Sequence, residues 1–224
     1  MCDVSELFYK VDGKEVEGYL GKPEECEILF VLKEPNDSNP QGFWFKNNVV
    51  DKCEVEREGQ KYYKSLGSLA YMLLDISNEH SEDLTEALRK CAYININYKN
   101  GGPKASIDYK RTLNYLHFLN RKQDKKWWKV YPDYQKRAEE ILEIIKRIKC
   151  KYIVTTWDIF NALVGEKLDT QKDHHEGIVT KNRIFRIAAF NEHKYILSFD
   201  PYRGLDYRCE SFAGVNQFLS EHTK

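Results

Sequence analysis

Three polar residues that lie far apart in the sequence, Glu34, Asn95 and Asp200, each stand in or just after an apolar run. A carboxylate such as Glu34 or Asp200 could orient or deprotonate an attacking water and stabilise a positively charged transition state. Asn95 offers both a donor and an acceptor, which suits the edge of a heterocycle. An asparagine in an apolar strand is costly unless it is paired, so Asn95, or Asn97 beside it, should bind either a ligand or a neighbouring loop.

Four apolar runs must position these residues, and their composition predicts buried strands. They span residues 27–33, 91–97, 152–157 and 195–199. Apolar residues at helical spacing predict helices at 66–74, 82–90, 107–119, 132–149, 158–165 and 205–222. Strands that alternate with helices form a parallel sheet through right-handed crossovers. The predicted fold is therefore α/β, a three-layer α/β/α sandwich with a central, mainly parallel four-stranded sheet.

Two segments outside this alternation predict antiparallel strands. Residues 7–20 alternate around Asp12-Gly13, a pair that suits a tight primed turn, so we expect an N-terminal hairpin that covers an edge of the sheet. Residues 174–190 have the pattern of an antiparallel pair or of one strand with an irregular approach.

Length and charge limit the classes of protein to consider. A chain of 224 residues, 42% of them hydrophobic, predicts a single domain over residues 1–224. Thirty-five basic residues balance thirty-five acidic ones, so no global field attracts nucleic acid or an anionic membrane, and such binding needs a local patch. No apolar run approaches the roughly 20 residues that cross a bilayer, and residues 1–10 lack the features of a signal peptide. We expect a cytoplasmic monomer with no membrane partner.

The cysteines and histidines do not predict a metal site. The six cysteines form no C-x-x-C pair, so we expect reduced thiols packed as small apolar residues. His174 and His175 are adjacent, and adjacent side chains point apart. We expect neither a metal nor a cofactor.

Polar residues follow all four predicted strands at the same edge of the sheet. In a parallel sheet of this kind, ligands bind beyond the carboxyl ends of the strands. The residues at this edge are Glu34, Asn36 and Asp37, then Asn95, Asn97 and 99–102, then 155–158, and finally 200–203. We therefore expect these side chains to converge on one site.

The order of these motifs resembles the uracil-DNA glycosylase superfamily. "LKEPND" is similar to the family's water-activating loop, and "GFWF" to its Gly-x-x-Phe. "YININ" is similar to the strand that carries its base-reading asparagine, and "SFDPYRGL" to its terminal His-Pro motif. The long helix that runs into "YIVTTW" is similar to the family's long helix that leads into strand three. The resemblance covers about residues 26–220.

The resemblance implies hydrolysis of the N-glycosidic bond of a flipped or single-stranded base. Glu34 would activate water and stabilise the cationic sugar, and Asn95 would read the base edge with Asn36 nearby. Phe45 would stack on the base, although Phe43, Trp44 and Phe45 could instead fill the core. The iron–sulfur members of the family carry a cysteine shortly after the strand-two asparagine. Asn100 stands there in this chain, so we expect no cluster.

Asp200 departs from the family, which has a histidine at this position. An ionised aspartate repels the negative charge that a departing base gains, and loss of a donor there lowers the rate about 10²- to 10³-fold. Asp200 could be protonated beside Glu34, accept from an exocyclic amine, or pair with Arg203. It could also cap the turn before Pro201. A specificity other than classical uracil excision is expected.

The expected partner is DNA or a nucleotide. The resemblance places Arg203, Leu205 and Arg208 in the loop that contacts phosphates and fills the gap left by a flipped base, with Lys99 near the strand-two end. Ordinary surface charge is the competing explanation. Residues 121–129 mix cations with two tryptophans, which suits a single strand or a solvated loop over the long helix.

Two other functions fit the same residues. The protein could be a catalytically inactive binding module of this fold that recognises a nucleotide, a nucleic acid or a protein that mimics one. It could also be a phosphoesterase in which Glu34, Asp37 and Asp200 hold Mg²⁺.

Overall fold

Four of the apolar runs form parallel strands at the centre of one sheet. The computed structural model describes residues 4–11, 14–33, 57–74, 84–97, 107–121, 132–164, 174–180, 183–190 and 193–198. The parallel strands are β4 (Ile28–Leu32), β5 (Cys91–Asn95), β6 (Tyr152–Thr155) and β9 (His193–Ser198). β4 pairs with β5 on one side and with β6 on the other, and β6 pairs with β9. Every residue of β4, β5 and β6 is buried, as expected for strands covered on both faces.

Antiparallel strands extend this parallel core at both edges. β3 (Gly18–Tyr19) pairs with β5, while β8 (Arg183–Phe190) pairs with β9 and β7 (His174–Thr180) pairs with β8. The order among the described strands is β3-β5-β4-β6-β9-β8-β7. β1 (Lys10–Val11) and β2 (Lys14–Glu15) form the predicted N-terminal hairpin, and β3, which follows them, covers the β5 edge. The antiparallel pair at 174–190 is also confirmed.

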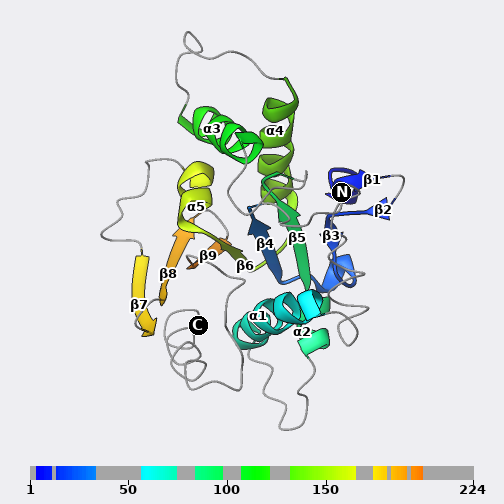
Figure 1. Cartoon of the computed structure of the whole chain (residues 1–224), viewed down its shortest axis with the longest axis vertical. Coiled ribbons are helices and arrows are strands. Elements are labelled where there is room, and N and C mark those ends of the chain that lie inside the picture. The colour runs from blue at the N-terminus through cyan, green and yellow to red at the C-terminus, as the bar shows by residue number, and fades with distance from the viewer. Residues whose placement is uncertain are drawn as a thin grey trace.

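Helices cover both faces of the sheet, so the molecule has three layers (Figure 1). α1 (Arg57–Leu73) and α2 (Leu84–Arg89) lie on one face, and α3 (Ile107–Arg121), α4 (Pro132–Arg147) and α5 (Trp157–Val164) lie on the other. Ile28, Phe30 and Leu32 of β4 pack with the α1–α2 layer, and Leu29 and Val31 pack with the α3–α5 layer. This alternation confirms the predicted α/β/α sandwich.

Two short elements complete the N-terminal part of the chain. Two 3-10 turns, η1 (Val4–Glu6) and η2 (Pro23–Glu25), precede β1 and β4. No helix within the described ranges is both long and apolar enough to span a bilayer. The predicted helix at 205–222 and the basic-aromatic segment 122–129 lie outside the described residues.

The three cysteines in the described part of the chain, Cys26, Cys91 and Cys150, are buried free thiols. Burial raises the pKa of Cys26 to about 12 and also raises the pKa values of Cys91 and Cys150. Such thiols stay protonated and pack as small apolar groups, as the sequence predicts for them.

Gly67 allows α1 and α2 to approach closely. A Cβ atom at Gly67 would lie 2.8 Å from the Leu84 Cβ at the start of α2, closer than real Cβ contacts. Leu84 is buried, so it has little room to move away. The close packing of these two helices therefore requires a glycine at this position.

We predict that Gly67→Ala destabilises the protein. In an isolated helix the same change stabilises by about 1 kcal/mol, because alanine has the higher helix propensity. Overpacking against Leu84 should reverse the sign and give a net loss of about 1 kcal/mol or more in the free energy of unfolding, measured by urea denaturation. Lys64→Ala, at an exposed position of the same helix, is the control. A more stable Gly67→Ala variant would contradict the close approach of the two helices.

Candidate functional site

The chain leaves β4 in one direction and leaves its two neighbours in the other. From β4 it runs to α1 on one face, whereas β5 leads to α3 and β6 leads to α5 on the opposite face. Ligands of such sheets bind where connections diverge in this way. The described residues at this edge are Lys33, Asn95, Asn97, Thr155, Thr156 and Asp158, and we call them the carboxyl rim.

Among the residues to which the sequence assigns a catalytic or ligand-binding role, Asn95 is the one that the structure describes. It is the last residue of β5, fully buried, and its register partner on β4 is Leu32. The other predicted site residues lie outside the described residues: Glu34, Asn36, Phe45, Lys99, Asp200, Arg203, Leu205 and Arg208. Asn97 is buried too, and its amide donates to the Lys33 carbonyl at 3.0 Å.

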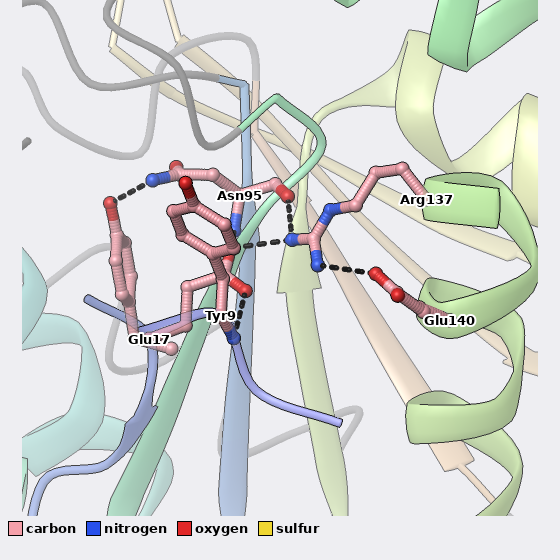
Figure 2. A network of polar contacts seen from close by, with 6 residues as sticks. Tyr9, Glu17, Asn95, Arg137 and Glu140 are labelled. Carbon is pink, nitrogen blue, oxygen red and sulfur yellow. Dashed lines mark hydrogen bonds and ion pairs between the residues drawn. The ribbon is translucent and has the colours of Figure 1, made fainter. Parts of the chain in front are cut away.

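Two side chains, and not a neighbouring strand, bond to the backbone amide and carbonyl of Asn95, because β3 does not extend this far along β5. The register of β3 with β5 places Val16 opposite Asn95, but the Val16 amide instead bonds to the Tyr9 carbonyl at 3.0 Å. The Asn95 amide therefore donates to the Glu17 Oε1 at 2.6 Å, and the Arg137 guanidinium donates to the Asn95 carbonyl (Figure 2). The Glu17 carboxylate and the Arg137 guanidinium thus make the two hydrogen bonds that a neighbouring strand would make with Asn95.

Glu17 and Arg137 form a buried ion pair, with 2.5 Å between Glu17 Oε1 and Arg137 Nη2. Their side chains are 0% and 3% exposed. Burial raises the pKa of Glu17, and the Arg137 charge and the hydrogen bonds from the Asn95 and Tyr9 amides offset this only in part. Glu140 approaches the other side of the guanidinium at 3.7 Å. The ionised form of Glu17 thus depends on Arg137.

Only one end of the Asn95 side-chain amide, the Nδ2, has a hydrogen bond to a described residue. Its Nδ2 donates to the Tyr93 hydroxyl at 2.5 Å. Its Oδ1 is buried and has no hydrogen-bond partner among the described residues. An unsatisfied buried acceptor costs about 1–3 kcal/mol, so such an atom calls for an explanation. With Nδ2 held by Tyr93, the Oδ1 remains as an acceptor without a hydrogen bond to a described residue.

A second polar cluster occupies the rim at the start of α5. Asp158 accepts hydrogen bonds from the Tyr109 hydroxyl at 2.6 Å and from the Thr156 hydroxyl, and the Lys33 Nζ lies 3.6 Å from its Oδ2. Burial alone would raise the pKa of Asp158, but the bonds from Thr156 and Tyr109 and the Lys33 charge outweigh it and lower the pKa. Asp158 is therefore ionised and fixed in position.

The backbone pairing between β4 and β6 stops just before this polar cluster. Their ladder ends at the pair Phe30–Val154. One residue further, the Thr155 hydroxyl donates to the Val31 carbonyl at 2.8 Å in place of a backbone bond. At the rim, side chains therefore replace backbone hydrogen bonds at the ends of both β5 and β6.

Several of these residues were not among the sequence-based candidates. Asp158 was predicted at the rim but without a role, although an aspartate in the first turn of a helix that follows a strand is a usable signal. Lys33 ends an apolar run, which is a weak signal. Glu17 and Arg137 are 120 residues apart, and nothing in the sequence near either residue indicates the other.

Metal binding is not supported within the described residues. None of their histidine, cysteine, aspartate and glutamate side chains form a group of three or more that could hold an ion. His174 and His175 are consecutive residues of β7. The carboxylates of the phosphoesterase alternative, Glu34, Asp37 and Asp200, lie outside the described residues.

We predict that Arg137→Met destabilises the protein by about 3–5 kcal/mol, because it leaves a buried carboxylate and the Asn95 carbonyl without their partner. Urea denaturation measures the loss. Lys136→Met, which removes an exposed lysine that pairs with Glu140 at 3.8 Å, should change stability by no more than about 0.5 kcal/mol. The double variant Glu17→Gln/Arg137→Met should recover part of the loss. Equal effects of Arg137→Met and Lys136→Met would show that the buried pair does not hold the edge.

Asp158→Asn should give a pH-dependent loss of stability. A carboxylate whose pKa is lower in the folded state stabilises the fold at pH values above its unfolded pKa, and this contribution disappears as the pH falls through the folded pKa. The difference in the free energy of unfolding between wild type and variant should be constant near pH 7 and shrink below about pH 4. Lys110→Met, at an exposed position of α3, is the control. A difference that grows on acidification would be inconsistent with a lowered pKa.

Comparison with known proteins assigns no family to this chain. A scan against protein-family models and a search of curated proteins both give no match. The resemblance to the uracil-DNA glycosylase superfamily therefore stays a prediction from the order of short motifs.

Proposed function

We propose that the protein recognises one nucleobase, flipped from a duplex or presented in a single strand, and hydrolyses its N-glycosidic bond. The observation that carries the proposal is the buried Asn95 Oδ1, which has no hydrogen-bond partner among the described residues. A nucleobase that offers an N–H group to this oxygen would satisfy it. The proposed site is the carboxyl rim around the end of β4.

The order of elements along the chain supports this proposal. Glu34 follows β4 in the sequence, and Asn95 ends β5. In a parallel sheet, the residues that end or follow these two strands share the carboxyl edge. The motif order that resembles the glycosylase superfamily thus coincides with the edge at which a ligand is expected.

The catalytic step needs one water and no metal. Water adds to the C1′ carbon of the sugar while the C1′–N bond breaks, so the products are an abasic sugar and a free base. The bonding electron pair leaves with the base, which takes up a proton as it is released, while Glu34 accepts the proton of this water and faces the positive charge of the sugar. Asp200 acts on the leaving base, and Phe45 stacks on it with Asn36 at its edge. Lys99, Arg203, Leu205 and Arg208 contact the strand.

A second candidate is a binding module that holds the base without cutting. The feature that favours it is Asp200, because an ionised aspartate there does not stabilise a departing anionic base. The balanced net charge of the chain also weakens its general attraction for nucleic acid. This candidate uses the same Asn95 and differs only in turnover.

The test is an oligonucleotide panel that carries uracil, hypoxanthine, xanthine and alkylated bases, in single strands and duplexes. Alkali cleaves each abasic site, so released bases appear as strand breaks. We expect release of at least one base, and a fall of about 10-fold or more in rate for Asn95→Ala, the loss of a hydrogen bond to a buried group. Glu34→Gln should bind the same base and release little of it.

The control is Asn114→Ala, which removes an asparagine from the exposed side of α3 and should leave release unchanged. Base-dependent binding without release would replace the enzyme by the binding module. Absence of both release and base-dependent binding, or activity abolished by a chelator, would reject the glycosylase proposal.

A further inference from the structure

Lys33 has a rim position that the proposed base recognition does not use. It follows β4 directly, and its carbonyl is fixed by the Asn97 amide at 3.0 Å. Its side chain is 37% exposed. β4 is the strand whose chain leaves toward the opposite face from both neighbours, so its end is the centre of the expected ligand site.

The Lys33 ammonium is held near the rim without a close hydrogen bond to a described residue. Its ion-pair partner among the described residues, Asp158, is 3.6 Å away, beyond the usual 2.7–2.9 Å of a charge-assisted bond. The Tyr109 ring centroid is 5.9 Å from Nζ, at the outer limit of a cation–π contact. An ammonium has three donors, so donors of Lys33 are available to a ligand.

Asp158 does not depend on Lys33 for its own hydrogen bonds. The Tyr109 and Thr156 hydroxyls already donate to its two oxygens. The carboxylate is 43% exposed, and ion pairs of this exposure contribute about 0–1 kcal/mol. The pair is therefore weak enough to open, while Asp158 keeps the ammonium near the edge of the sheet.

We infer that Lys33 binds a phosphate of the nucleotide whose base is read at Asn95, an inference that rests on the proposed function. Val31 packs with the α3–α5 layer and Tyr93 with the α1–α2 layer, so alternation places Lys33 and Asn95 on opposite faces. Their strands are adjacent, about 4.8 Å apart. A nucleotide across the end of β4 reaches both, with its base on one side and its phosphate on the other.

The phosphate belongs either to a free nucleotide or to a nucleic-acid backbone, and the experiment separates the two sources. Binding of a nucleoside, its 5′-monophosphate and a single-stranded oligonucleotide is measured for wild type, Lys33→Met and Lys110→Met. Lys110, an exposed residue of α3, is the matched control. Thermal unfolding confirms that both variants are folded.

We expect Lys33→Met to remove most of the affinity advantage of the phosphorylated ligand over the nucleoside and to leave nucleoside binding unchanged. For the oligonucleotide, the slope of log K against log[salt] should fall by about 0.7–1, the contribution of one phosphate contact. Lys110→Met should retain the wild-type slope. Asp158→Asn should raise affinity for the phosphate ligand, because it removes a competing anion. An effect on the monophosphate alone identifies a nucleotide, and one on the oligonucleotide alone identifies a backbone phosphate.

Failure of this inference differs from failure of the proposed function. If Lys33→Met and Lys110→Met have equal slopes and equal monophosphate affinities, the inference is wrong, even where base-dependent binding persists. If binding does not depend on the base but Lys33→Met still lowers the slope on an unmodified strand, the phosphate contact holds and the base-reading function fails.

Discussion

The buried ion pair between Glu17 and Arg137 joins three parts of the fold. Glu17 belongs to the N-terminal segment, Arg137 to α4, and both bond to the backbone of Asn95 at the end of β5. Either charge alone would be unfavourable in a buried position. Desolvation offsets much of the attraction between the two, so the main effect of the pair is to fix the geometry of the groups that it contacts. Its effect is to complete the hydrogen bonding of the β5 edge where β3 ends. The position of Asn95 depends on this substitution of side chains for a strand.

Most of the fold follows from local sequence patterns. The continuous apolar runs at β4, β5 and β6 predict strands covered on both faces, and the structure buries all of their residues. Apolar spacing predicts α2, α3, α4 and α5 and the C-terminal part of α1, which begins at Arg57, before the predicted range 66–74. Asp12-Gly13 predicts the hairpin of β1 and β2. These features are predictable because each depends on residues that are close together in the sequence.

The contacts that build the rim do not follow from such patterns. Thr155 bonds to Val31, Tyr109 to Asp158, and Arg137 to Glu17 across separations of 124, 49 and 120 residues. Arg137 occurs in a helix rich in charged residues, where the sequence does not distinguish a buried arginine from a solvated one. The edge at which Asn95 lies was predictable from topology. The orientation of its amide was not, because it is fixed by a hydrogen bond to Tyr93 that strand spacing does not specify.

The alternation of side chains along β4 and β5 determines what a ligand at the rim can contact. Side chains on one face of the sheet meet the α1–α2 layer, and those on the other meet the α3–α5 layer. Asn95 and Lys33 therefore leave adjacent strands in opposite directions, and a ligand confined to one face reaches only one of them. A ligand that contacts both must lie across the end of β4. The crossovers diverge at this place. The same topology that puts helices on both faces of the sheet therefore places the Asn95 acceptor and the Lys33 ammonium on adjacent strands and opposite faces.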